Sequence, residues 1–251
     1  MADFAGYNLT ELRSLVLRLL RASDTTRYSA TATASDYDWI DNALNNAQVE
    51  FVDLTESVRS DYLLELTASQ RTYSLPANFL DVASAYWYEA TDDYTNLRII
   101  STAELDMHTT DWRTATGDPE MVYIDGSETM LKKLGVYKIP DASGASSPSV
   151  VGNIKLRIYR LSDALSGVSD YPEILRQYHR ALVYFAAAEL LESQQEDSVE
   201  YKRSRDLYSR FYGMLKPAKK RISDPAKGRR PRMESHMWSS YSTFNWYDQY
   251  K

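Results

Sequence analysis

The sequence predicts a mixed α+β fold: an α-helical bundle formed by N- and C-terminal helices, an inserted antiparallel β-rich domain, and an extended C-terminal tail. Apolar residues recur at helical spacing near both ends of the chain, whereas the middle shows the alternation that is typical of strands. Neither helical pair could bury its apolar stripe alone, so we expect the two pairs to pack as one body. The expected divisions are a helical body of residues 1–60 and 172–215, a β-rich insertion at 61–171, and a tail at 216–251.

Two helices are expected before the insertion, at residues 9–22 and 36–58. The first follows Asn8, and Glu11 three residues later gives the spacing of a capping box, in which two side chains satisfy free amides at a helix start. The second has Trp39 in its first turn, where we expect it to anchor the helix. Its apolar stripe at helical spacing consists of Ile40, Ala43, Leu44, Ala47 and Phe51.

Short strands are expected throughout the insertion. Residues 62–66 and 71–75 alternate and are joined by a short polar link, which predicts a hairpin. Ser101 and Glu104 repeat the capping-box spacing and predict a short helix that ends near Trp112. Glycines recur every nine residues at positions 117, 126, 135 and 144, a spacing that turns between short strands produce. The remaining strands are expected at 82–89, 97–100, 121–124, 130–136 and 154–161.

Two further helices are expected after the insertion, at residues 172–192 and 196–215. Pro172 lies where a helix start tolerates proline, and Pro217 is expected to close the last helix. The apolar stripe of the first consists of Ile174, Tyr178, Leu182, Phe185 and Leu190, and that of the second of Tyr201, Leu207, Tyr208, Phe211 and Leu215.

The composition excludes several classes of chemistry. The chain has no cysteine, which rules out disulfides, thiolate zinc sites and a cysteine nucleophile. Its longest apolar run, residues 181–188, is far shorter than the ~20 residues that a membrane span needs. The first four residues give no expectation of a signal peptide. Neither glycine pattern of a phosphate-binding loop occurs.

The three histidines lie in different segments, without the spacing of a metal site. Asp106, His108 and Asp111 could approach a metal, because residues three or four apart share a helix face. A solvated helix face is the favoured interpretation of this cluster. His179 is expected at the boundary of an amphipathic helix and not as a general base. The sequence therefore predicts no metal site, no cofactor and no catalytic residue.

Charge is distributed unevenly along the chain, whose net charge is −6. The tail carries nine basic and three acidic residues, while the rest of the chain carries 20 basic and 32 acidic residues. Such a tail is expected to contact something that the acidic body does not. Its stretch 216–232 can be a solvated linker, match an acidic protein partner, or bind DNA phosphates. The basic side chains that would face this partner or DNA are Lys219, Lys220, Arg221, Lys227, Arg229, Arg230 and Arg232.

The end of the tail is rich in aromatic residues but too short to form a core. Large aromatic side chains that cannot pack internally are enriched at interaction hot spots. Docking on a partner is therefore favoured, and folding back on the chain's own body is the alternative. The residues expected to dock are Trp238, Tyr241, Phe244, Trp246, Tyr247 and Tyr250.

Four stretches of the sequence together resemble the head-to-tail adaptor (connector) proteins of tailed bacteriophages. They are an early amphipathic helix, a helix like the pattern aromatic–I–(D/N)–x–A–L–N–x–A–Q–x–x–F, a hairpin like T–A–G–Q–x–x–Y–x–L–P–x–D–F–L, and a proline-initiated helix containing Y–H–x–A–L. Ser69 and Asn78 stand where the hairpin pattern has Gly and Asp, both at turn positions. The resemblance covers residues 9–191, and the stretches are residues 9–13, 39–51, 67–80 and 171–182.

The resemblance implies a virion structural protein without catalytic activity. Such adaptors form a ring, commonly of twelve copies, under the portal protein at the portal vertex. The ring extends the channel through which the genomic double-stranded DNA passes, and it carries tail proteins of the nozzle, tube or fibre. In this family a C-terminal segment often reaches into the portal, so the aromatic tail is expected to dock there.

The resemblance also implies a location in the virion neck, after synthesis in the cytoplasm of a bacterial host. Two other functions stay open from the residues themselves. One is a DNA-binding protein that uses its basic C-terminal tail, whose affinity for duplex DNA would fall steeply with salt. The other is a neck or tail-tube structural protein of different symmetry.

Overall fold

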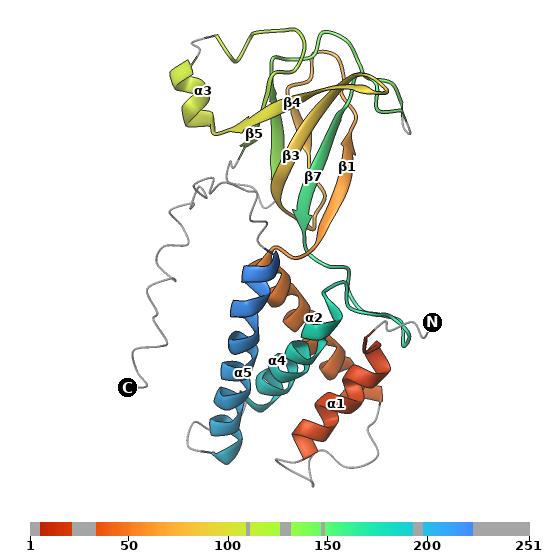
Figure 1. The fold of residues 1–251 in the computed structure, drawn as a ribbon, viewed down its shortest axis with the longest axis vertical. Coiled ribbons are helices and arrows are strands. Elements are labelled where there is room, and N and C mark those ends of the chain that lie inside the picture. Colours follow the sequence, from red (N-terminus) through yellow and green to blue (C-terminus); the bar gives the residue numbers. More distant parts are fainter. Residues whose placement is uncertain are drawn as a thin grey trace.

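The computed structural model describes residues 6–21, 34–108, 111–125, 132–146, 149–192 and 198–222. This part of the chain contains five α-helices and a curled seven-stranded sheet, so the predicted mixed α+β class is confirmed. Four helices lie together at one end of the molecule, and the sheet lies at the other end (Figure 1). Within the described residues, no helix combines the length and the hydropathy that crossing a membrane requires.

The N-terminal helices are α1, Leu9–Arg21, and α2, Ala34–Thr55. The capping box predicted at the start of α1 is confirmed. The Asn8 side chain accepts a hydrogen bond from the Glu11 N–H (2.9 Å), and the Glu11 carboxylate accepts one from the Asn8 N–H (3.0 Å). The stripe predicted for α2 is buried, since none of its five residues is more than 2 % exposed.

Two predictions for α2 are wrong. Trp39 does not anchor the helix against the core, because its side chain lies on the opposite face from Leu44 and is 63 % exposed. The helix also ends at Thr55 and not at residue 58. Glu56 follows with a φ of 53°, the left-handed conformation that commonly terminates helices, and the first strand begins three residues later.

The C-terminal helices are α4, His179–Glu192, and α5, Val199–Ile222. The predicted start at Pro172 is wrong: one turn of 3₁₀ helix, η1 (Arg176–Tyr178), precedes α4, and Leu175 before it is extended, with a ψ of 129°. Glu173 explains this difference. Its carboxylate accepts hydrogen bonds from both terminal nitrogens of Arg160 (2.7 and 2.9 Å), which ties this segment to the end of a strand.

The prediction that Pro217 closes the last helix is also wrong, because Pro217 lies inside α5. Proline lacks an N–H donor and disfavours a helix interior. Here the neighbouring residues Leu215 (7 % exposed) and Ala218 (0 %) are buried in the core of the body, while Pro217 faces solvent. Packing of these neighbours therefore outweighs the local preference of proline, and the helix continues to Ile222.

Helices α1, α2, α4 and α5 share one cluster of buried apolar side chains. Helix α4 packs against each of the other three, and its small residues include Ala181, Ala186, Ala187 and Ala188, all fully buried. The ring of Phe51 in α2 lies 5.6 Å from that of Tyr178 and 6.5 Å from that of Phe211 in α5 (centroid distances). The N- and C-terminal helices are thus in direct contact.

The sheet has the strand order β1-β7-β3-β4-β5-β6-β2 among the described residues. Neighbouring strands are antiparallel except β4 and β5, so the prediction of an antiparallel insertion is wrong at this pair. The chain crosses between these two parallel strands through α3, Thr102–His108, whose predicted capping box of Ser101 and Glu104 is confirmed. The strands are β1 Arg59–Leu64, β2 Thr72–Ser74, β3 Phe79–Ala90, β4 Asp93–Ile100, β5 Met121–Asp125, β6 Lys133–Tyr137 and β7 Ile154–Arg160.

The first two strands do not form the predicted hairpin. Strand β1 pairs with β7 and β2 pairs with β6, at opposite edges of the sheet. The sheet curls, so side chains from both edges, such as Leu64 and Tyr73, share one buried cluster. The link between the strands is fixed by the Tyr73 hydroxyl, which accepts a hydrogen bond from the Thr67 N–H (3.1 Å) and donates one to the Gln70 carbonyl (2.9 Å).

Gly135 does not lie in a turn, as its spacing predicts, but in the middle of β6. It pairs with Tyr123 of β5, whose ring lies directly over it. A Cβ atom at position 135 would lie 2.0 Å from the Tyr123 ring. Close packing against an aromatic ring is therefore the reason for this glycine.

Candidate interaction surfaces

Most of the tail residues singled out in the sequence lie outside the described residues. Lys219, Lys220 and Arg221 belong to the end of α5, where the Lys219 side chain is exposed. The others lie beyond Ile222, so their role in contacting a partner or DNA and in docking stays a prediction; they are Lys227, Arg229, Arg230, Arg232, Trp238, Tyr241, Phe244, Trp246, Tyr247 and Tyr250.

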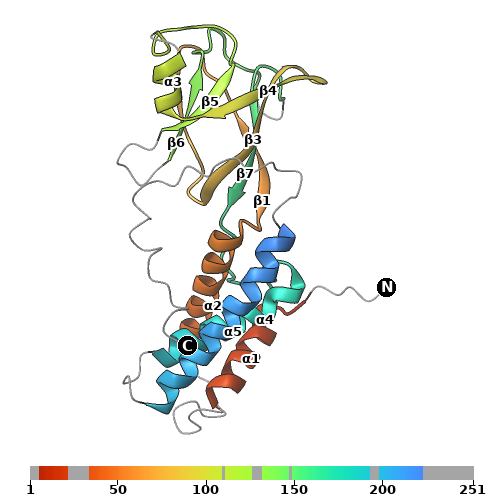
Figure 2. The ribbon, with the colours of Figure 1, turned by 60° about the vertical axis from the view of Figure 1, so that its left-hand side comes forward.

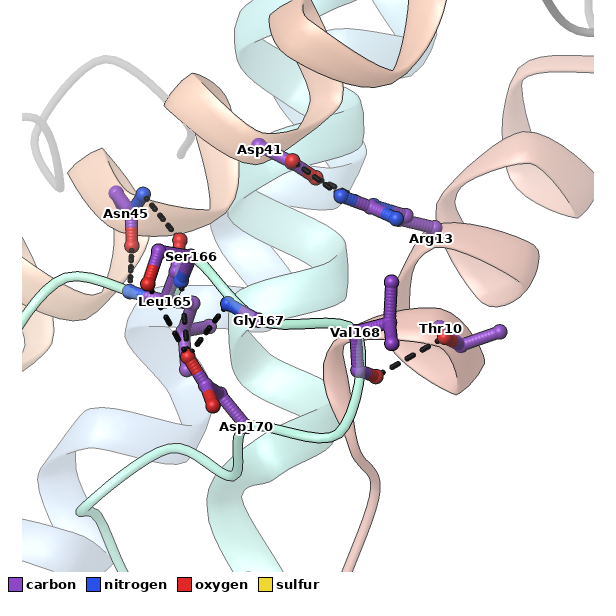
Figure 3. Close-up of polar contacts among 9 residues, drawn as sticks. All are labelled: Thr10, Arg13, Asp41, Asn45, Leu165, Ser166, Gly167, Val168 and Asp170. Atoms are coloured by element: carbon purple, nitrogen blue, oxygen red, sulfur yellow. Dashed lines mark hydrogen bonds and ion pairs between the residues drawn. The ribbon is translucent and has the colours of Figure 1, made fainter. Parts of the chain in front are cut away.

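The segment that connects the sheet to the C-terminal helices crosses the helical body. We call residues 161–175, which connect β7 to α4, the strap. The side-chain amide of Asn45 in α2 binds it in both directions: its nitrogen donates to the Leu165 carbonyl (3.2 Å) and its oxygen accepts from the Leu165 N–H (2.8 Å) (Figure 3). Gln48, one turn further along α2, donates to the Asp163 carbonyl (2.8 Å). Both residues belong to the stretch 39–51 that resembles the adaptor pattern.

The strap also accepts hydrogen bonds from the first turn of α1. The Leu9 N–H donates to the Asp170 carbonyl (2.9 Å). The Thr10 hydroxyl donates to the Val168 carbonyl (3.0 Å) (Figure 3). Amides in the first turn of a helix have no partner within the helix. The carboxylate of Asp170 in turn accepts hydrogen bonds from the N–H groups of Gly167 (2.7 Å) and Ser166 (3.0 Å), and these bonds lower the pKa of Asp170.

An ion pair completes this junction. The guanidinium of Arg13 in α1 binds the carboxylate of Asp41 in α2 through two nitrogens, with an Nε–Oδ1 distance of 2.6 Å (Figure 3). The two side chains are only 16 % and 19 % exposed. Paired geometry of this kind fixes the relative position of two elements more strictly than a single contact does. The strap, α1 and α2 therefore form one rigid junction.

This junction presents apolar side chains to solvent. Val168, Tyr171 and Leu175 of the strap are 62 %, 46 % and 52 % exposed, and Tyr7, just before α1, is 40 % exposed. Beside them is an open hollow of about 480 Å³ lined by Gly6, Tyr7, Arg176, Gln177 and Arg180. Exposed apolar groups rimmed by polar ones are typical of interaction surfaces.

His179 lies beneath this surface and is not the boundary residue that its sequence context predicts, since it is only 1 % exposed. Its Nδ1 accepts a hydrogen bond from the Tyr7 N–H, and its Nε2 donates to the Ile174 carbonyl, both at 3.1 Å. Burial lowers the pKa of His179, and the nearby charge of Arg176 lowers it further. The imidazole thus connects the N-terminal segment to the start of α4.

The cluster of acids near α3 is engaged in structural contacts. The Asp106 carboxylate accepts a hydrogen bond from the Trp112 indole (2.8 Å) and pairs with Arg113 (3.1 Å), and these contacts lower the pKa of Asp106. In the described part of the chain, no group of three or more potential ligands could hold a metal ion.

Acidic groups also gather where α2, α4 and α5 meet. Burial raises the pKa of Glu50 in α2, with a further contribution from neighbouring Asp53. Burial likewise raises the pKa of Glu189 in α4, whose carboxylate accepts a hydrogen bond from Asn46 (2.8 Å). The hydroxyl of Tyr208 donates to Glu192 (2.8 Å). The sequence carries a signal for this surface, because α2 contains five acidic residues and no basic one.

The sequence profile of the SU10 adaptor protein family matches residues 7–234. No curated protein matches the sequence. Among solved structures, a chain described as "Neck of empty GTA particle computed with C6 symmetry" is similar, with 13 % sequence identity over 78 % of this chain and 87 % of that chain. Its TM-score of 0.26 is too low to carry a structural argument. The profile match includes all four stretches on which the adaptor resemblance rests, and the chain therefore belongs to the SU10 adaptor protein family.

Proposed function

We propose that this protein is a structural component of the neck of a tailed phage or phage-like particle, where it forms an adaptor ring between the portal protein and the tail. The family match over residues 7–234 is the observation that carries this proposal. It includes the helical body, the sheet and the basic start of the tail. The protein acts by binding and assembly, without catalysis.

In this function, copies of the chain form a closed ring, of twelve in the arrangement that the resemblance implies. The lumen of the ring continues the DNA channel of the portal, and the ring carries tail proteins on its other side. The rigid junction of the strap with α1 and α2 supports this function, because a load-transmitting adaptor needs fixed relations between its elements. The exposed apolar side chains of this junction offer one surface for a neighbouring protein.

The aromatic end of the tail docks on the portal. Six large aromatic side chains lie within residues 238–251, and fully burying one such ring contributes about 1.5 to 3 kcal/mol. Three or four seated rings can offset the cost of ordering the segment, and a ring of copies multiplies the effect through avidity.

Deleting residues 238–251 tests this proposal. The buried clusters of the described residues extend no further than Ala218, so the truncated protein should retain its circular dichroism spectrum and melting temperature. Co-sedimentation with the purified portal should fall at least about tenfold. A matched control with Ser239, Ser240 and Ser242 changed to Ala keeps all six aromatics and should bind normally. Full portal binding by the truncated protein would refute docking through the tail.

A second candidate function, DNA binding through the basic segment, is favoured by one observation. Helix α5 carries eight basic and two acidic residues and leads directly into the basic stretch of the tail. If DNA binding is the main function, the free protein should bind duplex DNA with an affinity that falls steeply with salt. Two results would favour the adaptor function. A protein whose basic residues within 227–232 are neutralised would still bind the portal, and the wild-type protein would not bind duplex DNA.

A further inference from the structure

The outer face of α2 carries a regular stripe of exposed residues. We define the α2 stripe as Trp39, Asn42, Asn46, Val49 and Asp53, which alternate at spacings of three and four and are all exposed. Trp39 and Val49 are 63 % and 42 % exposed. Alternating spacings of three and four keep these five side chains on one face of the helix. Within the described part of this copy, the stripe faces away from the buried stripe of the same helix, and Asn46 at its edge donates a hydrogen bond to Glu189 of α4 (2.8 Å).

The outer face of α5 carries a stripe with the same spacing. We define the α5 stripe as Lys202, Asp206, Ser209, Gly213 and Lys216, also exposed. Gly213 is the informative member, because glycine destabilises the middle of a helix. A Cβ atom at position 213 would meet nothing within 4 Å. No packing among the described residues requires a glycine there, whereas the close approach of a second helix would.

The two helices are complementary in charge. Helix α2 has five acidic residues and no basic one, while α5 has eight basic and two acidic residues. The buried faces of both helices turn toward the same apolar cluster, so the two stripes point outward and cannot meet within one copy. Charge complementarity therefore points to contact between two copies.

The two stripes also lie at similar heights along the helical body. The Tyr212 side chain of α5 is hydrogen-bonded to Glu50 of α2, which places these two residues at similar heights in the body. Both helices end next to the sheet, α2 where it leads into β1 and α5 at Ile222 (Figures 1 and 2). Rotation about a ring axis along the helices changes no residue's height. At a rise of about 1.5 Å per residue, Asp53 of one copy then lies within about 2 Å of the height of Lys216 in the next copy, and Val49 within about 3 Å of the height of Gly213.

We propose that the α2 stripe of one copy packs against the α5 stripe of the next copy, with Val49 beside Gly213 and Asp53 opposite Lys216. This inference rests on the proposed function, because a closed ring needs two different complementary surfaces on each copy. The side chain of Val49 fills the space above Gly213. Asp53 of the α2 stripe and Lys216 of the α5 stripe set the register of the contact.

The lack of native cysteine gives a direct test in the full-length protein. One preparation carries Val49→Cys and a second carries Gly213→Cys. The two preparations are mixed and oxidised under two conditions: without the portal at high protein concentration, and bound to the portal. A disulfide requires Cα atoms within about 7 Å, so the expected result is a cross-linked dimer joining one copy of each kind. The matched control pairs Val49→Cys with Ser14→Cys, an exposed position of α1 outside both stripes, and should give at least tenfold less heterodimer.

Charge reversal then tests the register. With the cysteines in place, either Asp53→Lys in one preparation or Lys216→Asp in the other should lower the yield about two- to fivefold, the range expected for one exposed ion pair, and the two reversals together should restore it. Rings on the portal with no more 49–213 heterodimer than the control would overturn the inference and leave the proposed function standing. Failure to oligomerise under either condition would overturn both.

Discussion

Replacing His179 with Ala should destabilise the helical body strongly. The imidazole is 1 % exposed and makes two hydrogen bonds of 3.1 Å, from the Tyr7 N–H to Nδ1 and from Nε2 to the Ile174 carbonyl. Each such bond contributes about 0.5 to 1.5 kcal/mol net, and the packing lost with the ring adds about 1 kcal/mol more. We therefore expect the free energy of unfolding to fall by roughly 2 to 4 kcal/mol.

The same residue should make stability depend on pH. Nδ1 accepts a hydrogen bond, so it cannot carry a proton without breaking that bond, and burial also lowers the pKa of His179 in the folded protein. In the unfolded chain the pKa returns to about 6.5. Below this pH the unfolded state binds more protons than the folded state, so the free energy of unfolding falls as pH decreases. The stabilisation by neutral His179 is fully present above about pH 6.5 and is lost as pH falls toward the folded pKa.

Urea denaturation at several pH values between 5 and 8 would measure both effects. Carboxylates contribute to the pH dependence as well, so the informative quantity is the difference between wild type and His179→Gln, which cannot titrate. That difference should shrink as pH falls below 6.5. If His179→Ala unfolds within 0.5 kcal/mol of wild type, or if wild type and His179→Gln show parallel pH profiles, the proposed connection between Tyr7 and α4 is refuted.

Three further variants test other contacts. Asn45→Ala removes both bonds to Leu165 and should lower the free energy of unfolding by about 1 to 3 kcal/mol in urea denaturation, whereas an exposed Ser14→Ala control should change it by less than about 0.5 kcal/mol. Gly135→Ala places a Cβ 2.0 Å from the Tyr123 ring and should cost about 1 to 3 kcal/mol from overpacking; an unchanged melting temperature would contradict the close packing. Asp170 has a lowered pKa in the folded protein, so its contribution is present above the unfolded value of about 3.9 and is lost as pH falls. The acid-induced loss of stability between pH 5 and 3 should therefore be shallower for Asp170→Asn than for wild type, and identical acid titrations of the two would contradict its role in the strap.

Local signals in the sequence predict local structure well here. The capping boxes at Asn8 and Ser101 are confirmed because a cap depends only on residues within one turn of the helix. The buried stripe from Ile40 to Phe51 is confirmed because burial of a helix face follows from its periodicity. The adaptor resemblance is confirmed by the family match.

The errors occur where distant residues decide the outcome. Pro217 continues a helix because Ala218 is buried against other helices. Glu173 holds the segment before α4 extended by pairing with Arg160 of a strand. Gly135 leaves room for the Tyr123 ring on the neighbouring strand and does not form a turn. The two strands of the expected hairpin find other partners because the sheet curls. None of these partners is adjacent in the sequence, so local patterns cannot identify them.

The interaction surfaces also differ in how much of each can be predicted from local sequence patterns. The strap could not be found by pattern, because its residues form no periodic stripe and its role depends on Asn45 in a helix about 120 residues earlier. The acidic bias of α2 and the basic bias of α5 are visible in the sequence as charge counts. Their significance requires the fold, which shows that both helices turn their apolar sides to one cluster and leave the α2 stripe and the α5 stripe exposed.

The stretch 39–51 shows why the outer face of α2 calls for a partner. Its inward residues are accounted for by folding, since the stripe from Ile40 to Phe51 fills the core while Asn45 and Gln48 hold the strap. Packing among the described residues gives no reason for a Trp at position 39, since its side chain is 63 % exposed and an exposed ring contributes little to the stability of one copy. The same holds for Gly213 in the middle of α5, since among the described residues a Cβ at this position would meet nothing within 4 Å. The exposed Trp39 ring and the unfilled space at Gly213 lie on helices of opposite charge. Each is unfavourable or neutral in a single copy, and each gains contacts only when one copy meets another.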